Sequence, residues 1–273
     1  MHDQRTLTVA DRSSHDGAEA AAGEWPVRVR VEGVSAGYGG PPVLEDISFA
    51  LHGGERVAVL GPNGGGKTTL FRVLIGELKP LAGLVDVPER CGLVPQTERS
   101  RLDFPVSALD VALMGGVSAR PWWRLAGRAD RARARDTLGT VGLADRADAT
   151  FGELSGGQRQ RVLVARALVQ DAPVVLLDEP FSGLDRPSAE RLDALLDRLA
   201  GDGRTVMIAT HDIDQARRWD RILCLNHRVI ALGAPGDVLT RQTLQATYGA
   251  AAVVSLPGDE GSIVLPPQDH TEP

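Results

Sequence analysis

A glycine-rich segment constrains this chain more than any other feature of its sequence. Residues 61–68 read Gly-Pro-Asn-Gly-Gly-Gly-Lys-Thr and fit the pattern G-x-x-x-x-G-K-[ST]. Residues 55–60 before it are mostly apolar, which predicts a short buried strand. Residues 67–75 after it place their leucines and valine on one face, which predicts a helix. A strand, a glycine-rich turn and a helix in this order predict a site for the phosphates of a nucleoside triphosphate.

Each residue type in this segment has a chemical role. Glycines let backbone N–H groups turn toward phosphate oxygens, and the helix N-terminus adds partial positive charge. Lys67 supplies a full charge to the β- and γ-phosphates, the Thr68 hydroxyl can ligate Mg²⁺, and Thr69 adds a further hydrogen bond. The residues predicted to bind the phosphates are Gly61, Pro62, Asn63, Gly64, Gly65, Gly66, Lys67, Thr68 and Thr69.

The composition is that of an ordinary globular protein. Of 273 residues, 42% are hydrophobic and 24% are charged, and the formal net charge of −6 gives no support to a nucleic-acid role. No apolar run approaches the roughly 18 residues that cross a bilayer, and the first residues lack the apolar centre of a signal peptide. We therefore expect a cytoplasmic chain, at most peripheral to a membrane, in which Cys91 and Cys224 are reduced core thiols.

The pattern along the chain predicts an α/β domain with a helical insertion. Strand patterns lie at 27–32, 43–51, 55–60, 83–87, 91–94, 174–177, 205–209, 221–225 and 228–232, and helix patterns follow at 188–200 and 213–219. The insertion is expected at about 97–169, inside a domain that spans 25–249. Residues 1–24 are polar and predict a disordered tail, whereas 250–273 could form edge strands or remain loose.

Further motifs follow the phosphate segment in a fixed order. Leu154-Ser155-Gly156-Gly157-Gln158 comes before an apolar strand pattern that ends in Asp178-Glu179, and His211 follows another apolar run. Together these motifs resemble those of the ATP-binding subunits of ABC transporters, over roughly residues 27–240. The resemblance implies a P-loop NTPase core with an antiparallel β subdomain and an inserted α-helical subdomain. It also implies an ATPase that requires ATP and Mg²⁺.

The resemblance gives catalytic roles to four polar residues that follow strand patterns. Asp178 would hold Mg²⁺, usually through water, and Glu179 would polarise the attacking water. The alternative for this pair is a helix N-terminal charge pair, which the upstream phosphate segment disfavours. Gln96 would contact the metal and the water, and His211 would touch the γ-phosphate and fix Glu179. The implied catalytic residues are Lys67, Gln96, Glu179 and His211, and the implied metal ligands are Thr68, Gln96 and Asp178.

The remaining nucleotide contacts implied by the resemblance lie at both ends of the site. Tyr38 would stack on adenine, although a tyrosine in an ordinary turn is the alternative. Ser155, Gly156, Gly157 and Gln158 would open a helix whose N-terminus faces the γ-phosphate held by a second subunit. Asp185 would lie in the loop that passes between the two nucleotides of this head-to-tail dimer.

The resemblance also implies partners. We expect a second ATPase subunit (a copy of the same chain), separate transmembrane permease subunits and, for an importer, an extracytoplasmic substrate-binding protein, with no nucleic acid. Residues 101–106 and 110–115 are similar to the corresponding stretch of manganese and zinc importer ATPases. Haem, an iron chelate or another cargo stays open. A soluble ABC ATPase acting on nucleic acid is a weaker alternative, because paired cassettes and coiled-coil insertions are missing from the sequence.

Two smaller features complete the interpretation. Arginines between Arg120 and Arg135 lie near Trp122-Trp123, and a solvated helical face is favoured over contact with lipid or a partner. Gly65 stands where the family usually has Ala, Ser or Cys, which should loosen the phosphate loop slightly.

Overall fold

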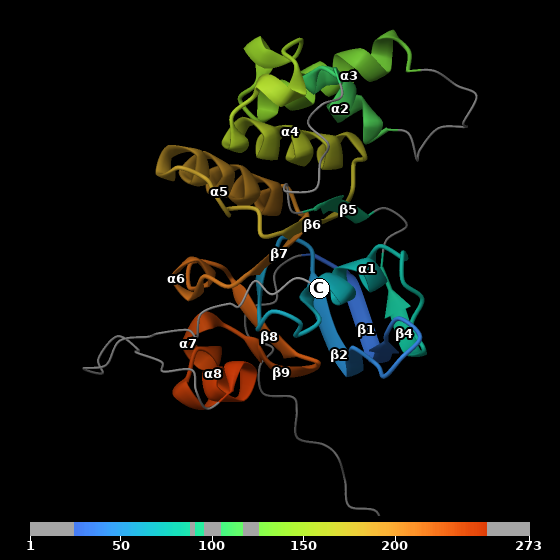
Figure 1. The fold of residues 1–273 in the computed structure, drawn as a ribbon, viewed down its shortest axis with the longest axis vertical. Coiled ribbons are helices and arrows are strands. Elements are labelled where there is room, and N and C mark those ends of the chain that lie inside the picture. Colours follow the sequence, from blue (N-terminus) through green and yellow to red (C-terminus); the bar gives the residue numbers. More distant parts are fainter. Residues whose placement is uncertain (1–24, 88–90, 96–104, 117–125, 250–273) are drawn as a thin grey trace, which may run out of the picture.

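A six-stranded sheet forms the centre of the computed structural model, which describes residues 25–87, 91–95, 105–116 and 126–249 (Figure 1). The strand order is β5-β6-β7-β3-β8-β9, in which β9 pairs antiparallel with β8 and the other neighbours pair in parallel. The strands span Cys91–Val94 (β5), Val174–Asp178 (β6), Thr205–Thr210 (β7), Arg56–Leu60 (β3), Arg221–Asn226 (β8) and Arg228–Gly233 (β9).

A second, antiparallel sheet covers one side of the molecule. Its order is β2-β1-β4, with β1 at Val27–Ala36, β2 at Leu44–His52 and β4 at Ala82–Asp86. Helix α1, Lys67–Leu74, packs between this sheet and the central one, so that Leu70 and Phe71 share a core with β1 and β3. Burial in β1 alternates along part of its length, because successive side chains of a strand point to opposite faces.

The opposite face of the central sheet carries the remaining helices. Helix α5, Arg186–Gly201, and α6, Ile213–Ala216, pack near β3 and β7. Helices α2 (Ala108–Met114), α3 (Arg128–Thr140) and α4 (Gly156–Val169) form a separate unit, at the top of Figure 1, that joins the sheet through β5 and α5. In β3 the valines face α1 while Ala58 and Leu60 belong to the second core, so both faces are buried, as expected for a parallel sheet.

The sequence does not predict the last two helices of the described chain. These are α7, Pro235–Val238, and α8, Arg241–Tyr248, which pack on β8 and β9. Two short 3₁₀ helices, Ala144–Arg146 and Phe151–Glu153, connect α3 to α4. Helix α6 is shorter than the predicted 213–219. The other predicted elements are present, with ends that differ by a few residues.

The observed architecture confirms the predicted fold class, an α/β core with an antiparallel sheet and an inserted helical unit. The predicted tails at 1–24 and 250–273 lie outside the described residues, so the domain limits remain predictions. Cys91 and Cys224 are both thiols, and burial raises the pKa of each to about 11. Within the described ranges, no helix is both long enough and apolar enough to span a bilayer.

Candidate functional site

The phosphate segment links β3 to α1 and encloses the side chain of its own lysine. Lys67 is the first residue of α1 and is only 8% exposed. Its Nζ donates hydrogen bonds to the carbonyl oxygens of Gly61, at 2.6 Å, and Pro62, at 3.0 Å. The N-cap residue of α1 is Gly66, which offers no side-chain cap, so the N–H groups of the first turn remain available to an anion.

Two opposing effects act on the charge of Lys67. Burial lowers its pKa below the ordinary value, and the carboxylates of Glu179 and Asp178 raise it again. The buried ammonium group of Lys67 suits a triphosphate, because the phosphates add negative charge that favours its protonated form beyond what the two carboxylates supply.

The candidate magnesium site lies between α1 and the end of β6. Asp178 is the last residue of β6, and its carboxylate accepts a hydrogen bond from the Thr68 hydroxyl at 2.9 Å. Mg²⁺ prefers oxygen ligands and usually takes one or two from carboxylates while keeping several waters. A hydroxyl and a carboxylate oxygen this close together therefore fit the predicted ion.

Glu179 and His211 form the second pair at this edge of the sheet. The Nδ1 atom of His211 lies 2.9 Å from the nearer Glu179 carboxylate oxygen, and the backbone N–H of Glu179 donates to Ala209. Glu179 has φ +48°, a left-handed conformation that costs a non-glycine residue about 1–3 kcal/mol and is found often at functional sites. Glu179 thus contacts His211 from a strained backbone position directly after β6.

Tyr38 leans against α1 from the loop between β1 and β2. Its hydroxyl lies 3.4 Å from Thr69 Oγ1 and accepts a hydrogen bond from Arg72 at 3.2 Å. The Arg72 guanidinium also lies 5.8 Å from the ring centre. Tyr38 is 55% exposed, so its flat ring is accessible for stacking beside the phosphate segment. Thr69 itself is buried, with its hydroxyl toward Tyr38.

The segment from Ser155 to Gln158 caps helix α4. The Ser155 hydroxyl oxygen accepts from the Gln158 N–H, and the Gln158 side chain accepts from the Ser155 N–H at 2.9 Å. Because a hydroxyl can accept and donate together, Ser155 retains a proton to donate. The helix N-terminus next to it carries partial positive charge, which suits an anion.

Asp185 begins helix α5 directly beside this cap. Its carboxylate accepts from the Ser188 N–H at 3.1 Å. The Ser188 side chain, and then this backbone N–H, hold the pKa of Asp185 below its ordinary value by hydrogen bonding to the carboxylate. The start of α5 touches the start of α4, since a Cβ on Gly157 would lie 2.6 Å from the Ser188 hydroxyl oxygen. The predicted residues therefore fall into two groups. One lies around Lys67, with Thr68–Asp178 and Glu179–His211 contacts, and the other lies around Ser155, with the caps of α4 and α5.

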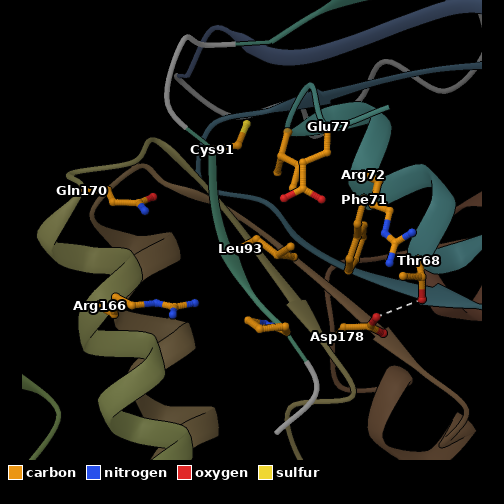
Figure 2. Close-up of a pocket in the computed structure, with 11 residues that line it drawn as sticks. Thr68, Phe71, Arg72, Glu77, Cys91, Leu93, Arg166, Gln170 and Asp178 are labelled. Carbon is orange, nitrogen blue, oxygen red and sulfur yellow. Dashed lines mark hydrogen bonds between the residues drawn. The ribbon is translucent and has the colours of Figure 1, made fainter. Parts of the chain in front are cut away.

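A cleft of about 630 Å³ opens beside the candidate magnesium site (Figure 2). Figure 2 shows Thr68 and Asp178 at one side, with α1 residues above them. Arg166 of α4, and Gln170 just after that helix, project from the other side. Burial lowers the pKa of Arg166. The cleft is thus lined from α1, β5 and the end of β6, and also from the C-terminal end of α4 in the helical unit.

Gln96 and the arginines at 120 and 124 lie outside the described residues. Pro95, which lines the cleft, is the last described residue before Gln96. On α3, Arg133 and Arg135 form ion pairs with Asp171 and Asp148, in keeping with the solvated helical face favoured from the sequence.

Sequence reasoning missed three residues that lie against predicted nucleotide-binding residues. Arg72 holds the Tyr38 hydroxyl, His227 donates its backbone N–H to Gly65, and the hydroxyl of Tyr248, on α8, is shielded from solvent beside the backbone of Gly61. Burial raises the pKa of Tyr248. No motif marks these residues, because each contact joins two segments that are far apart in the sequence.

Comparison with known proteins adds evidence of relationship. A family model described as ABC transporter matches residues 44–182. The zinc transport system ATP-binding protein TroB of Treponema pallidum is 39% identical over 230 residues, which covers 81% of this chain and 86% of that protein. The manganese transport system ATP-binding protein MntB of Bacillus subtilis is 38% identical over 230 residues, covering 81% of this chain and 92% of that one.

A solved structure agrees with these sequence relatives. It is an inward-facing conformation of an ABC transporter described as of metal-chelate type. Its chain superposes with a TM-score of 0.75 at 32% identity, covering 82% of this chain and 89% of that chain. Sequence and fold therefore point to the same group of proteins.

Proposed function

The chain belongs to the ABC transporter family as an ATP-binding subunit, and from this premise we propose that it powers import of a divalent metal ion such as manganese or zinc. The protein is a transport ATPase that works with membrane permease subunits. The metal cargo is inferred from the two relatives named for zinc and manganese transport. Because the cargo crosses through other subunits, no cargo site is expected on this chain.

One observation carries the catalytic part of the proposal. Asp178 and Glu179 follow each other at the end of β6, where the first contacts Thr68 and the second contacts His211. The two carboxylates therefore take different roles. Asp178 is directed to the metal at the phosphates, and Glu179 is directed to the attacking water. When bound, Mg²⁺ would be held by Thr68 and Asp178, with Gln96 as the third predicted ligand, and it would neutralise negative charge on the triphosphate.

The proposed reaction is the hydrolysis of ATP by in-line attack of water. Glu179 orients the water and takes its proton, while the water oxygen bonds to the γ-phosphorus and the bond to the β–γ bridging oxygen breaks. Lys67 and the N–H groups of α1 stabilise the charge on the phosphate oxygens. His211 holds Glu179 in position, and ADP and phosphate leave.

We propose that a second copy of the chain completes each nucleotide site. The donors at the start of α4 lie with Asp185 and Ser188 in one group, and the phosphate segment belongs to the other. A head-to-tail dimer would bring Ser155 and Gly156 of one copy to the γ-phosphate held by the other. Tyr38 would stack on adenine. ATP-driven closure and reopening would act on the permease at the cytoplasmic face, and an extracytoplasmic binding protein would deliver the cargo.

The test is metal uptake in cells that lack this chain, compared with cells that carry wild type or Glu179→Gln. We expect manganese or zinc uptake to be lost in both defective strains and restored by wild type. Normal uptake of both metals, together with ATP hydrolysis by the purified protein, would contradict the divalent cargo. Loss of uptake of a metal chelate in the same strains would instead identify a chelate as the cargo. This alternative is motivated by the similar solved structure, which is described as of metal-chelate type.

A further inference from the structure

His227 occupies the turn between β8 and β9 and bonds to the phosphate segment. Its backbone N–H donates to the carbonyl oxygen of Gly65 at 2.9 Å. Its φ of +57° is a left-handed conformation, which a histidine adopts less readily than glycine. The turn therefore keeps an unfavourable backbone conformation at the point where it touches the phosphate segment.

The other polar groups of His227 bind Val43, just before β2, and Glu45, within β2. Its carbonyl oxygen accepts from the Glu45 N–H at 2.8 Å, and ring atom Nδ1 lies 2.9 Å from the Val43 carbonyl oxygen. Since a carbonyl can only accept, Nδ1 carries the proton in this contact. The neighbouring Arg228 also bonds to the Glu45 carboxylate through Nε, at 3.1 Å. One residue thus joins the phosphate segment to β2 by three hydrogen bonds.

The start of β2 presses directly on the phosphate segment as well. Gly66 has φ +98°, and a Cβ at this position would lie 2.5 Å from Leu44 Cδ2. Gly65 and Gly66 are therefore held from two directions, by the backbone of His227 and by Leu44. Movement of β2 relative to the β8–β9 turn would move the N-terminus of α1.

Val43, directly before β2, also closes the loop that carries Tyr38. The N–H of Val43 donates to the Ala36 carbonyl oxygen at 2.7 Å, so the loop between β1 and β2 is anchored at Val43. The Tyr38 hydroxyl contacts Thr69 and Arg72 on α1. Val43 is thus shared: its N–H fixes the Tyr38 loop and its carbonyl oxygen binds the His227 ring.

We propose that His227 is a positioning residue for the nucleotide, one that fixes the distance between the Tyr38 loop and the phosphate segment so that base and triphosphate bind together. The inference rests on the proposed function, in which Tyr38 receives adenine. The imidazole acts through Val43 on the base end and the backbone acts through Gly65 on the phosphate end. His227 itself touches no reacting atom.

The test compares two substitutions that keep the backbone of the turn. His227→Gly accepts the left-handed conformation and retains both backbone bonds but removes the ring. His227→Asn also tolerates that conformation, and its side-chain amide can donate to Val43 in place of Nδ1. We expect His227→Gly to raise the Kd for ATP roughly threefold to tenfold, as for one lost hydrogen bond, with kcat within about twofold of wild type. His227→Asn should restore the Kd.

A double-mutant cycle with Tyr38→Ala separates positioning from general destabilisation. If His227 acts through the Tyr38 loop, His227→Gly should not raise the Kd for ATP further once Tyr38 is alanine. An equal rise in both backgrounds, an unchanged Kd for His227→Gly, or no rescue by His227→Asn would overturn the proposal. Absence of ATP hydrolysis by wild type would instead contradict the proposed function, and the Kd values would still decide the role of His227.

Discussion

The phosphate side of the nucleotide site and the signature side are built in different ways. The phosphate side, defined as residues 61–69, 178, 179 and 211, is held by side-chain contacts between separate elements, such as Thr68 with Asp178 and His211 with Glu179. The signature side, defined as residues 155–158 and 185, is held by local caps at the starts of α4 and α5. One side depends on the tertiary fold and the other mainly on helix-end chemistry.

This difference teaches where a single chain suffices. The charged groups proposed for catalysis meet one another within one copy, because parallel strands β3, β6 and β7 end at the same edge of the sheet. The signature side instead offers a hydroxyl proton and helix N–H groups that suit an anion. In the proposed dimer, one chain therefore supplies the charged catalytic residues of a site, and the second copy completes that site with the start of its α4.

Removing the proposed base should produce the largest effect and should act on the phosphate side alone. Glu179→Gln keeps the size of the side chain but cannot accept a proton, so we expect the rate of ATP hydrolysis to fall by roughly 10²–10⁴. ATP should still bind, and the dimer should accumulate because hydrolysis no longer opens it. Phosphate release and size-exclusion chromatography with Mg-ATP measure the two effects.

Glu190→Gln supplies the matched control for this substitution. Glu190 lies on α5 and pairs with Arg186 in an exposed i,i+4 ion pair. Such pairs contribute little to stability, so hydrolysis should stay near wild type. A Glu179→Gln protein that hydrolyses ATP normally would contradict the role of Glu179 as the base. One that remains monomeric with Mg-ATP would contradict the proposed dimer.

The phosphate side could be predicted from sequence because its residues follow buried apolar strands. The run Val174–Leu177 is wholly apolar and contains two β-branched valines, so a strand that ends just before Asp178 and Glu179 can be predicted, and the structure has β6 there. The contacts of His227 and Tyr248 could not be predicted. They depend on how β8, β9 and α8 lie against the phosphate segment. Helix α8 itself is short and mostly polar, and Leu244 is its one fully buried apolar residue, so its sequence gives only a weak signal.

The two central glycines of the signature side should respond differently to alanine. A Cβ on Gly157 would lie 2.6 Å from the Ser188 hydroxyl oxygen, whereas nothing lies within 4 Å of a Cβ on Gly156. We expect Gly157→Ala to lower the melting temperature of the monomer. Gly156→Ala should leave the melting temperature unchanged but reduce hydrolysis roughly tenfold, by crowding the γ-phosphate of the partner copy and losing about one charged hydrogen bond.

Three measurements on the Gly156→Ala and Gly157→Ala proteins decide this comparison: melting temperature, Kd for ATP and hydrolysis rate at saturating ATP. In the dimer model, Gly156→Ala retains monomer binding of ATP and loses the ATP-driven dimer. Unchanged hydrolysis by a folded Gly156→Ala protein would mean that the start of α4 does not face a nucleotide.

The smallest effect should appear in the pH dependence of ATP binding, and only the phosphate side should produce it. Lys67 must be protonated to attract phosphate, and burial lowers its pKa below the ordinary value. Raising the pH through this lowered pKa removes the positive charge, so the affinity for ATP should begin to fall at a lower pH than for an exposed lysine. Bound phosphate stabilises the protonated form, and binding in that range should therefore take up protons.

Two variants sharpen the assignment of this titration. Glu179 raises the pKa of Lys67, so Glu179→Gln should move the midpoint of the affinity loss to lower pH. Gly156→Ala should leave the midpoint in place, because a hydroxyl and backbone N–H groups on the signature side do not titrate in this range. Titration calorimetry in buffers of different ionisation enthalpy measures both the affinity and the proton uptake. The opposite result would be a midpoint of the affinity loss that moves with Gly156→Ala and not with Glu179→Gln. It would place the titrating group outside the phosphate side, because of these two substitutions only Glu179→Gln removes a charge that acts on Lys67.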